Sequence, residues 1–340
     1  MINAEKERSP TQTILFILLV IAALFAAPRL LSGISPNILT DRLSTFATVF
    51  LGIFIEAAPF LFVGALASGI VELYVDRDTL VRIIPKNAFL SALTGSLLGL
   101  FIPVCDCGTV PLTRRLLRKG FPIPGGIAFL LSAPILNPIV IVSTATAFGI
   151  GRMLFFRLGL SVIIALATGL VFSAAKTPWE ILAPTDWISG QDADPLTDEE
   201  ALTFWGKARR ILLITTDEFF DIGRFLIVGS SIAAAIQTFV PQSELLKIGG
   251  GPLTSVLVMV SLAVILSICS TVDAFVALGF ATTFSAGSIL SFLTFGPMVD
   301  IKSLFMLLHV FRKRTVMYLV LIPLLISILA GLMINLYLGG

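Results

Sequence analysis

Long apolar stretches separated by short polar segments dominate the pattern of this chain. A helix needs about 20 mostly apolar residues to cross the hydrocarbon layer of a membrane, so each such stretch is a candidate membrane helix. The stretches lie at residues 14–31, 45–75, 89–104, 121–150, 158–175, 211–240, 253–269, 274–299 and 316–338. Several are long but interrupted by proline or glutamate, and 89–104 is short. The pattern predicts an all-α membrane protein with roughly eight to ten membrane helices.

Composition agrees with this interpretation. Of the 340 residues, 56% are hydrophobic and 13% are charged, whereas a soluble domain carries about 25% charged residues. A soluble core of this size has no room for so much apolar surface. The 23 basic and 21 acidic residues nearly balance, so nothing points to a nucleic-acid partner. We expect a multi-pass protein of the plasma (inner) membrane, embedded in the lipid bilayer, with no cofactor and no enzymatic activity.

One polar stretch divides the chain near its middle. Residues 176–210 are rich in acidic residues and carry no recognisable motif, which indicates a solvated linker. The predicted organisation is an N-terminal helix and loop (1–42), a first membrane repeat (43–175), this linker, and a second membrane repeat (211–340). A cleaved signal peptide is the alternative for 14–31, and we favour a retained helix because many hydrophobic segments follow.

The two membrane regions resemble each other. The segment from Glu56 to Gly64 matches the segment from Asp221 to Gly229, and two further pairs follow in the same order. These pairs are Cys105 with Cys269 and Asn137 with Asp300, at offsets that fall only from 165 to 163 residues. Three anchors in one order and at one spacing indicate a tandem duplication.

Charge placement predicts how the halves are oriented. The basic cluster of the first half, at 114–119, follows the cysteine motif, whereas that of the second half, at 312–314, follows a Gly-Pro motif. If basic loops stay cytoplasmic, the halves have opposite orientations. Inverted repeats of this kind bind substrate near the membrane midplane, where helices are broken or re-entrant. Inversion also requires an odd number of crossings per half, which makes 89–104 a candidate re-entrant segment.

The most unusual motif is a pair of cysteines at a helix break. Cys105, Asp106 and Cys107 end an apolar run and are followed by Gly108 and Pro111, which interrupt a helix. Two thiols one residue apart are soft donors that suit a thiophilic ion. Tight helix packing through small residues is the alternative. The aspartate between the thiols favours a substrate-binding role for all three residues.

The second repeat carries a related motif. Cys269 is followed by two hydroxyl residues and Asp273, which adds a thiol and a carboxylate to the candidate binding residues. If the two breaks face each other, Cys105, Cys107 and Cys269 surround one cavity. Three thiolates match trivalent arsenic or antimony, which favour pyramidal sulfur ligation. A disulfide between two of them is the competing explanation, which a reducing cytosol disfavours.

Two acids occupy equivalent places in the repeats. Buried charges in membranes are costly, so Glu56 and Asp221 are functional candidates by default. Asp221 has Arg224 three residues away, and an ion pair between them is the simplest account of that arginine. Glu56 has no basic neighbour one helical turn away, so protonation is its easiest route to burial. We therefore assign both acids a hypothetical role in proton coupling.

A second pair of breaks carries Asn137 and Asp300, each next to a proline motif. The two side chains either cap helices or contact substrate, and the sequence favours neither role. For Asp300 and Lys302, a position at the membrane edge is a further alternative. His309, next to the 312–314 cluster, is expected to be interfacial.

Taken together, these motifs resemble the predicted permease family (DUF318), which includes the ArsP-like organoarsenical efflux permeases. The matching segments run over 103–111, 119–122, 133–138, 269–275 and 296–302, within a region from about Leu43 to the C-terminus. The resemblance implies a multi-spanning permease that exports trivalent arsenicals or related metalloids. It makes Cys105, Cys107 and Cys269 the candidate metalloid ligands.

Three functional hypotheses follow. The first is proton-coupled secondary efflux of a thiophilic metalloid, because no ATP-binding Gly-x-x-x-x-Gly-Lys-Ser/Thr motif is present. The second is a permease for a small sulfur compound or an anion bound by half-helix N-termini. The third is a membrane thiol oxidoreductase, which the Cys-x-Cys spacing and the duplicated architecture disfavour. Homo-oligomerisation is left open.

Overall fold

The structure, a computed structural model, describes residues 36–75, 85, 87–102, 104–175, 177–183, 204–239 and 251–337. The predicted helix at 14–31 and most of the predicted linker lie outside these residues. The chain divides into two compact units, Met1–Val49 and Phe50–Gly340. Helix α2 (Pro36–Tyr74) begins in the first unit and ends in the second. All other described helices belong to the second unit.

Helices make up nearly all of the described residues, and no strand occurs among them. This confirms the all-α class. The first half continues with α4 (Ala88–Leu98), α5 (Asp106–Arg118), α6 (Ile123–Leu136), α7 (Pro138–Phe148), α8 (Arg152–Val171), η1 (Phe172–Ala174) and α9 (Pro178–Ile181). The second half has α11 (Phe204–Phe239), α13 (Pro252–Leu266), α14 (Asp273–Gly279), α15 (Ala286–Phe295), α16 (Ile301–Val310) and α17 (Lys313–Tyr337). Helix α11 thus begins inside the segment predicted as linker.

Four described helical segments are long and apolar enough to cross a membrane, at Thr40–Tyr74, Arg152–Ala174, Trp205–Phe239 and Lys313–Tyr337. A fifth span is obtained if α6 and α7, bent by 42° at their break, count as one. The other apolar stretches form shorter helices, among them α4, α13, α15 and α16. Run length alone therefore located the membrane-embedded helices but did not separate full crossings from shorter ones.

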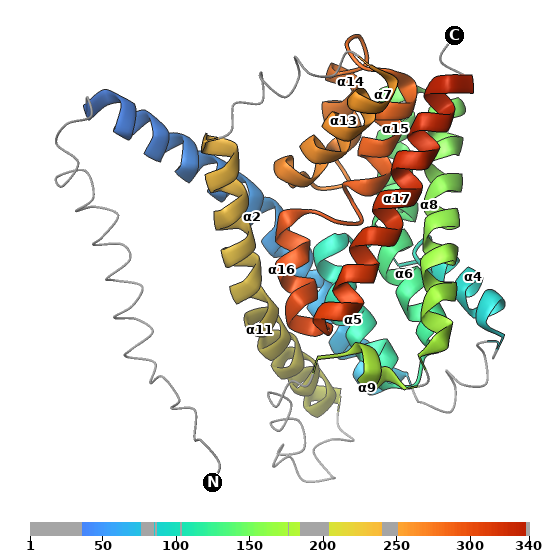
Figure 1. Cartoon of the computed structure of the whole chain (residues 1–340). Coiled ribbons are helices and arrows are strands. Elements are labelled where there is room, and N and C mark those ends of the chain that lie inside the picture. The colour runs from blue at the N-terminus through green and yellow to red at the C-terminus, as the bar shows by residue number, and fades with distance from the viewer. Residues whose placement is uncertain are drawn as a thin grey trace, which may run out of the picture. The chain divides into compact units, whose positions relative to one another are not determined.

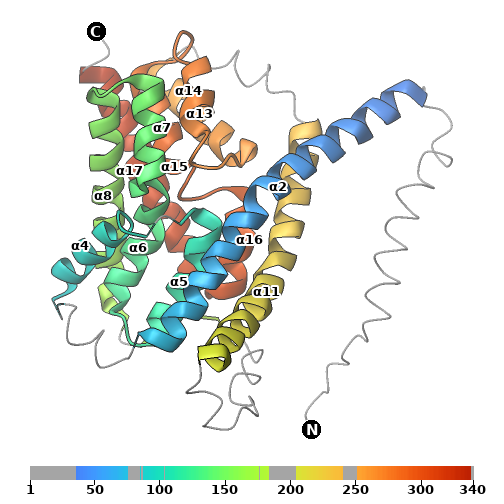
Figure 2. The same cartoon turned by 180° about the vertical axis from the view of Figure 1, so that it is seen from behind.

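The order of elements is the same in both halves. Each half has a long helix, two pairs of shorter helices and a final long helix. In the first half these are α2, α4–α5, α6–α7 and α8, and in the second half they are α11, α13–α14, α15–α16 and α17. In this correspondence α5 matches α14 and α7 matches α16. The contact between α5 and α16 therefore has its equivalent in the contact between α14 and α7. In Figure 1 and Figure 2, residues 50–74 of α2 run opposite to α11, and α8 runs opposite to α17. These features agree with the predicted inverted repeat, whose symmetry rotation stays a prediction.

Close helix approaches place the long helices against the breaks. A Cβ atom added to Gly64 of α2 would collide with the backbone of Gly108 in α5. Gly229, the equivalent residue of α11, lies against the backbone of Lys302 in the same way. Residues eight apart share one helix face, so Glu56 points to the same side of α2 as Gly64. The sequence-equivalent glycines thus bring α2 and α11 onto the helix starts that carry the candidate residues.

Both basic clusters lie beside α9. The Arg118 guanidinium carbon is 5.9 Å from the centre of the Trp179 ring. Arg312 donates a hydrogen bond from Nε to the Leu182 carbonyl oxygen at 3.1 Å. The basic segments of the two halves therefore share one end of the molecule, as the charge pattern requires if both are cytoplasmic.

This placement predicts the sidedness of α8. A cysteine introduced at Glu180, in α9, should react with a membrane-impermeant maleimide in inside-out vesicles and not in intact cells. A cysteine at Ile150, which is exposed just before α8, should react only in intact cells, because α8 crosses the membrane between the two positions. Labelling of both positions from one side would contradict the topology.

Candidate functional site

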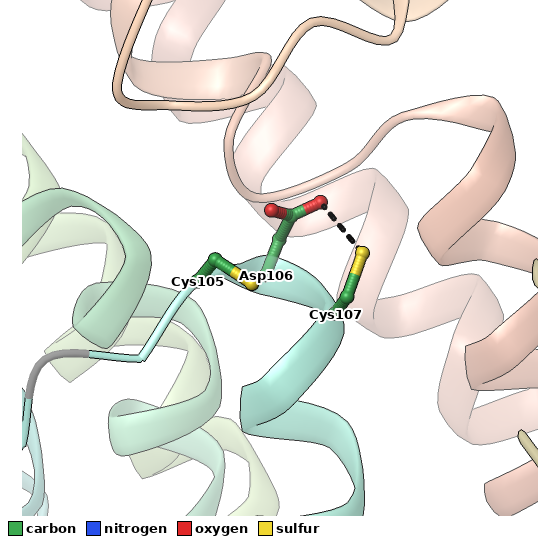
Figure 3. A group of neighbouring side chains, drawn as sticks. All are labelled: Cys105, Asp106 and Cys107. Atoms are coloured by element: carbon green, nitrogen blue, oxygen red, sulfur yellow. Dashed lines mark hydrogen bonds between the residues drawn. The ribbon is translucent and has the colours of Figure 1, made fainter. Parts of the chain in front are cut away.

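The cysteine motif forms the start of α5. Cys105 is the N-cap residue, and Asp106 and Cys107 open the first turn of the helix. The ligand atoms of these three buried side chains all lie within 4.8 Å of one another. The Cys107 thiol and the Asp106 carboxylate point toward each other, with 3.8 Å between Sγ and Oδ2 (Figure 3). Two thiols and a carboxylate therefore converge at a buried helix N-terminus.

One cavity joins this motif to residues of the other half. Its wall consists of residues from α2, the start of α5, the break after α13 and the start of α16: Ile53, Glu56, Ala57, Phe60, Cys105, Asp106, Cys107, Cys269 and Lys302. The space among these side chains is about 190 Å³, including the part that opens outward, and no part of it is wide enough to hold a water molecule. All three cysteines are free and buried. The structure thus brings both breaks and Glu56 to one place, as the pairing of the two halves predicts.

Cys269 stands apart from the other two thiols. It lines the cavity but does not belong to the group of ligand atoms within 4.8 Å. Its thiol accepts a hydrogen bond from the Thr271 hydroxyl at 3.5 Å. The compact part of the site therefore holds two thiols, and a third requires Cys269 to approach.

Lys302 is the residue of this cavity that sequence reasoning missed. Lys302 and Asp300 are each only 2% exposed, so both side chains are buried within the protein, and their position relative to the membrane edge stays a prediction. The Lys302 ammonium lies 3.2 Å from Asp106 Oδ2 and 2.6 Å from Asp300 Oδ2. It also donates a hydrogen bond to the Ser267 carbonyl at 3.0 Å. The sequence did contain a signal for this residue: a lysine two residues after an aspartate, at a break in a membrane-embedded helix, is a candidate for a functional ion pair.

The loop that carries Ser267 has an unusual backbone. Ser267, which ends α13, has φ of 47° and is the sole described residue other than glycine with a positive φ. Such conformations cost free energy in residues with a side chain and persist where the surroundings enforce them. Here the Ser267 hydroxyl accepts from the Ile301 amide at 3.3 Å and its carbonyl accepts from Lys302. The break after α13 is thus fixed to the start of α16.

Asn137 and Asp300 both cap helices. Asn137 Oδ1 accepts from the Ile139 amide at 3.0 Å at the start of α7, and Asp300 Oδ1 accepts from the Ser303 amide at 2.7 Å at the start of α16. Neither residue lines the cavity. Asp300 has the additional role of holding Lys302, so it acts on the cavity through that residue.

Asp273 also lies outside the cavity lining. Its carboxylate pairs with Arg157 of α8 at 2.6 Å, and Arg157 donates to the Thr144 hydroxyl of α7 at 2.8 Å. Arg157 is completely buried. Removing one partner of a buried ion pair leaves an uncompensated charge, which typically costs about 3–5 kcal/mol. The pair therefore ties α14 to α7 and α8.

The environments of Asp221 and Glu56 differ despite their equivalent positions. Asp221 pairs with Arg114 at 3.2 Å, with His309 at 3.0 Å, and with Arg224 at 2.6 Å, the last of which confirms the predicted pair. Asp221 does not line the cavity, whereas Glu56 does. The His309 side chain is 8% exposed and stacks on Phe225 with 4.1 Å between ring centres, and its interfacial position stays a prediction.

Comparisons with known proteins agree with this architecture. A family model described as a predicted permease matches residues 42–336. The UPF0718 protein YcgR of Bacillus subtilis is 44% identical over 285 residues, which cover 84% of this chain and 94% of the relative. A protein of Streptococcus mutans described as a putative two-component membrane permease complex subunit is 39% identical over 272 residues, covering 79% of this chain and 88% of the relative. No solved structure matches the chain. The chain belongs to the predicted permease family (UPF0718) and is a multi-pass permease of the plasma membrane.

Proposed function

We propose that this permease exports trivalent arsenicals, or related thiophilic metalloids, by a secondary mechanism driven by the proton gradient. The observation that carries the proposal is the convergence of Cys105, Cys107 and Glu56 on one cavity. Soft thiols are the donors that a thiophilic element prefers. An ionisable side chain inside a membrane protein is a candidate for proton transfer.

Binding of a methylated arsenical balances without a net charge. Methylarsenite carries two hydroxyl groups, and two thiols replace them. Two arsenic–oxygen bonds break, two arsenic–sulfur bonds form, each thiol proton leaves with a hydroxide as water, and the arsenic stays trivalent. Cys105 and Cys107 supply the two thiols. Inorganic arsenite has a third exchangeable hydroxyl, for which Cys269 is the remaining thiol of the cavity wall.

Glu56 is the proposed coupling group. It makes no ion pair with any residue that the structure describes, whereas Asp106 is paired with Lys302. Glu56 can therefore take up a proton on the outer face and release it to the cytoplasm without breaking an ion pair. Its carboxylate lines the same cavity as Cys269 and Lys302.

The charges of the cavity disfavour the anion-permease alternative. Lys302 is the cation of the cavity wall, and two carboxylates, Asp106 and Asp300, already neutralise it. An anion entering here would face more negative than positive charge. The name of the Streptococcus relative supports a second subunit for this permease, which we include in the proposal as an additional component.

A resistance assay tests the proposed function. Expression of the chain in a bacterial host without its own arsenic exporters should raise the tolerated concentration of methylarsenite and arsenite. A variant with Cys105, Cys107 and Cys269 all replaced by serine should give no protection at equal membrane abundance. Full resistance from the triple variant would refute the thiol mechanism. Binding of methylarsenite to the purified protein provides a measurement that needs no second subunit.

A further inference from the structure

We infer that the same cavity binds a soft divalent cation, of the cadmium and zinc class, through Cys105, Cys107 and Asp106. In this state the cation replaces the Lys302 ammonium at the Asp106 carboxylate. The inference rests on the proposed function only in taking this cavity as the transport site. It adds a second class of substrate, which differs from an arsenical in charge and in its need for a carboxylate.

The donor set supports a cation of this class. Two thiols and one carboxylate oxygen lie within 4.8 Å of one another in this site. Zinc accepts both cysteine sulfur and carboxylate oxygen as ligands, and cadmium is softer still. Three protein ligands hold a cation while leaving a position open, which suits a cargo that must later leave.

Asp106 is the residue that distinguishes the two substrate classes. Its Oδ2 atom faces the Lys302 ammonium at 3.2 Å. Its Oδ1 atom is buried and has no hydrogen-bond partner among the described residues. Buried carboxylate oxygens normally have partners, so this oxygen is available to a ligand that enters the site. A neutral arsenical held by two thiols needs no carboxylate ligand, whereas a divalent cation can be bound by this oxygen.

Lys302 has the partners that an exchangeable counter-ion needs. Besides Asp106, its ammonium contacts Asp300 at 2.6 Å and the Ser267 carbonyl at 3.0 Å. It can therefore leave Asp106 and remain paired. When the cation binds, two metal–sulfur bonds form and the two thiol protons pass to the solvent. The net charge of the cavity is then the same before and after loading, which avoids burying an additional charge.

Equilibrium binding of Cd²⁺ to the purified permease tests the inference. The sulfur-to-cadmium charge-transfer absorption in the ultraviolet reports binding directly. Asp106→Asn and Asp300→Asn are matched variants, because each removes one carboxylate from Lys302 and only Asp106 is a proposed ligand. We expect Asp106→Asn to weaken Cd²⁺ binding by at least about tenfold more than Asp300→Asn does. It should also weaken Cd²⁺ binding more than methylarsenite binding.

Other outcomes separate the inference from the proposed function. Wild-type protein that binds methylarsenite but not Cd²⁺ overturns the inference alone, and the reverse overturns the arsenical proposal alone. Equal losses in the two asparagine variants also overturn the inference. If Asp106→Asn does not elute as a monodisperse species, Lys302→Met replaces it. That variant removes the competing ammonium and should bind Cd²⁺ more tightly than the wild type, and unchanged or weaker binding counts against the inference.

Discussion

Replacing either Cys105 or Cys107 by serine is expected to abolish resistance to both methylarsenite and arsenite. The two thiols lie in one group of ligand atoms within 4.8 Å, so both can attach to a single arsenic atom. The second attachment is intramolecular, and losing it removes a gain in affinity of about 100-fold or more. We therefore expect binding of methylarsenite to the purified single variants to weaken by at least that factor.

Cys269→Ser is the matched control for this prediction. It removes a buried thiol from the same cavity, but the thiol lies outside the close group. It should weaken arsenite binding by roughly tenfold and methylarsenite binding by much less, because methylarsenite has two exchangeable positions. Equal losses in all three single variants would mean that the cysteines act through packing. Wild-type binding by Cys105→Ser or Cys107→Ser would rule out chelation by the pair.

The location of the cavity followed from local sequence signals. Glycine, proline, asparagine and aspartate mark helix ends through backbone geometry and capping, and these effects act within a few residues. The breaks at Cys105, Asn137 and Asp300 were therefore visible in the sequence. The internal similarity then indicated which breaks correspond, and this placed Cys269 at the same cavity as Cys105.

The partners of buried charges could not be derived in the same way. Arg157 lies 116 residues before Asp273, and no local pattern connects them. The pairing of Lys302 with Asp106 also joins the two halves of the chain. Such ion pairs are set by tertiary packing, so the sequence identified the acids and the nearby Arg224, but not the cations that come from distant parts of the chain.

Equivalent positions in the repeats also acquired different surroundings. The match between Glu56 and Asp221 predicted one shared role. Asp221 instead contacts Arg114 and His309, whereas Glu56 has no ion pair among the residues that the structure describes. Duplication conserves the backbone position, whereas neighbouring helices decide whether an acid is paired. The unpaired acid that faces the cavity is therefore the better candidate for coupling.

Glu56→Gln is expected to abolish gradient-driven transport while leaving methylarsenite binding largely intact. Glutamine keeps the size and hydrogen-bonding capacity of a protonated glutamate, but it cannot release a proton. Because the two thiols make the bonds to arsenic, the equilibrium affinity at Cys105 and Cys107 should change little. In everted vesicles with an imposed proton gradient, uptake by this variant should fall to the rate measured without a gradient.

Asp221→Asn provides the comparison at the equivalent position of the second half. Asp221 lies outside the cavity lining and is held by three basic side chains, so its charge does not follow the proton gradient through the cavity. We expect this variant to keep a gradient-dependent component of uptake, with any loss traced to reduced membrane abundance. Gradient-driven uptake that survives in Glu56→Gln would show that the acid is structural. If both variants lose gradient dependence to the same extent, Glu56 and Asp221 act together in coupling. The two acids would then share the role that their sequence equivalence suggests.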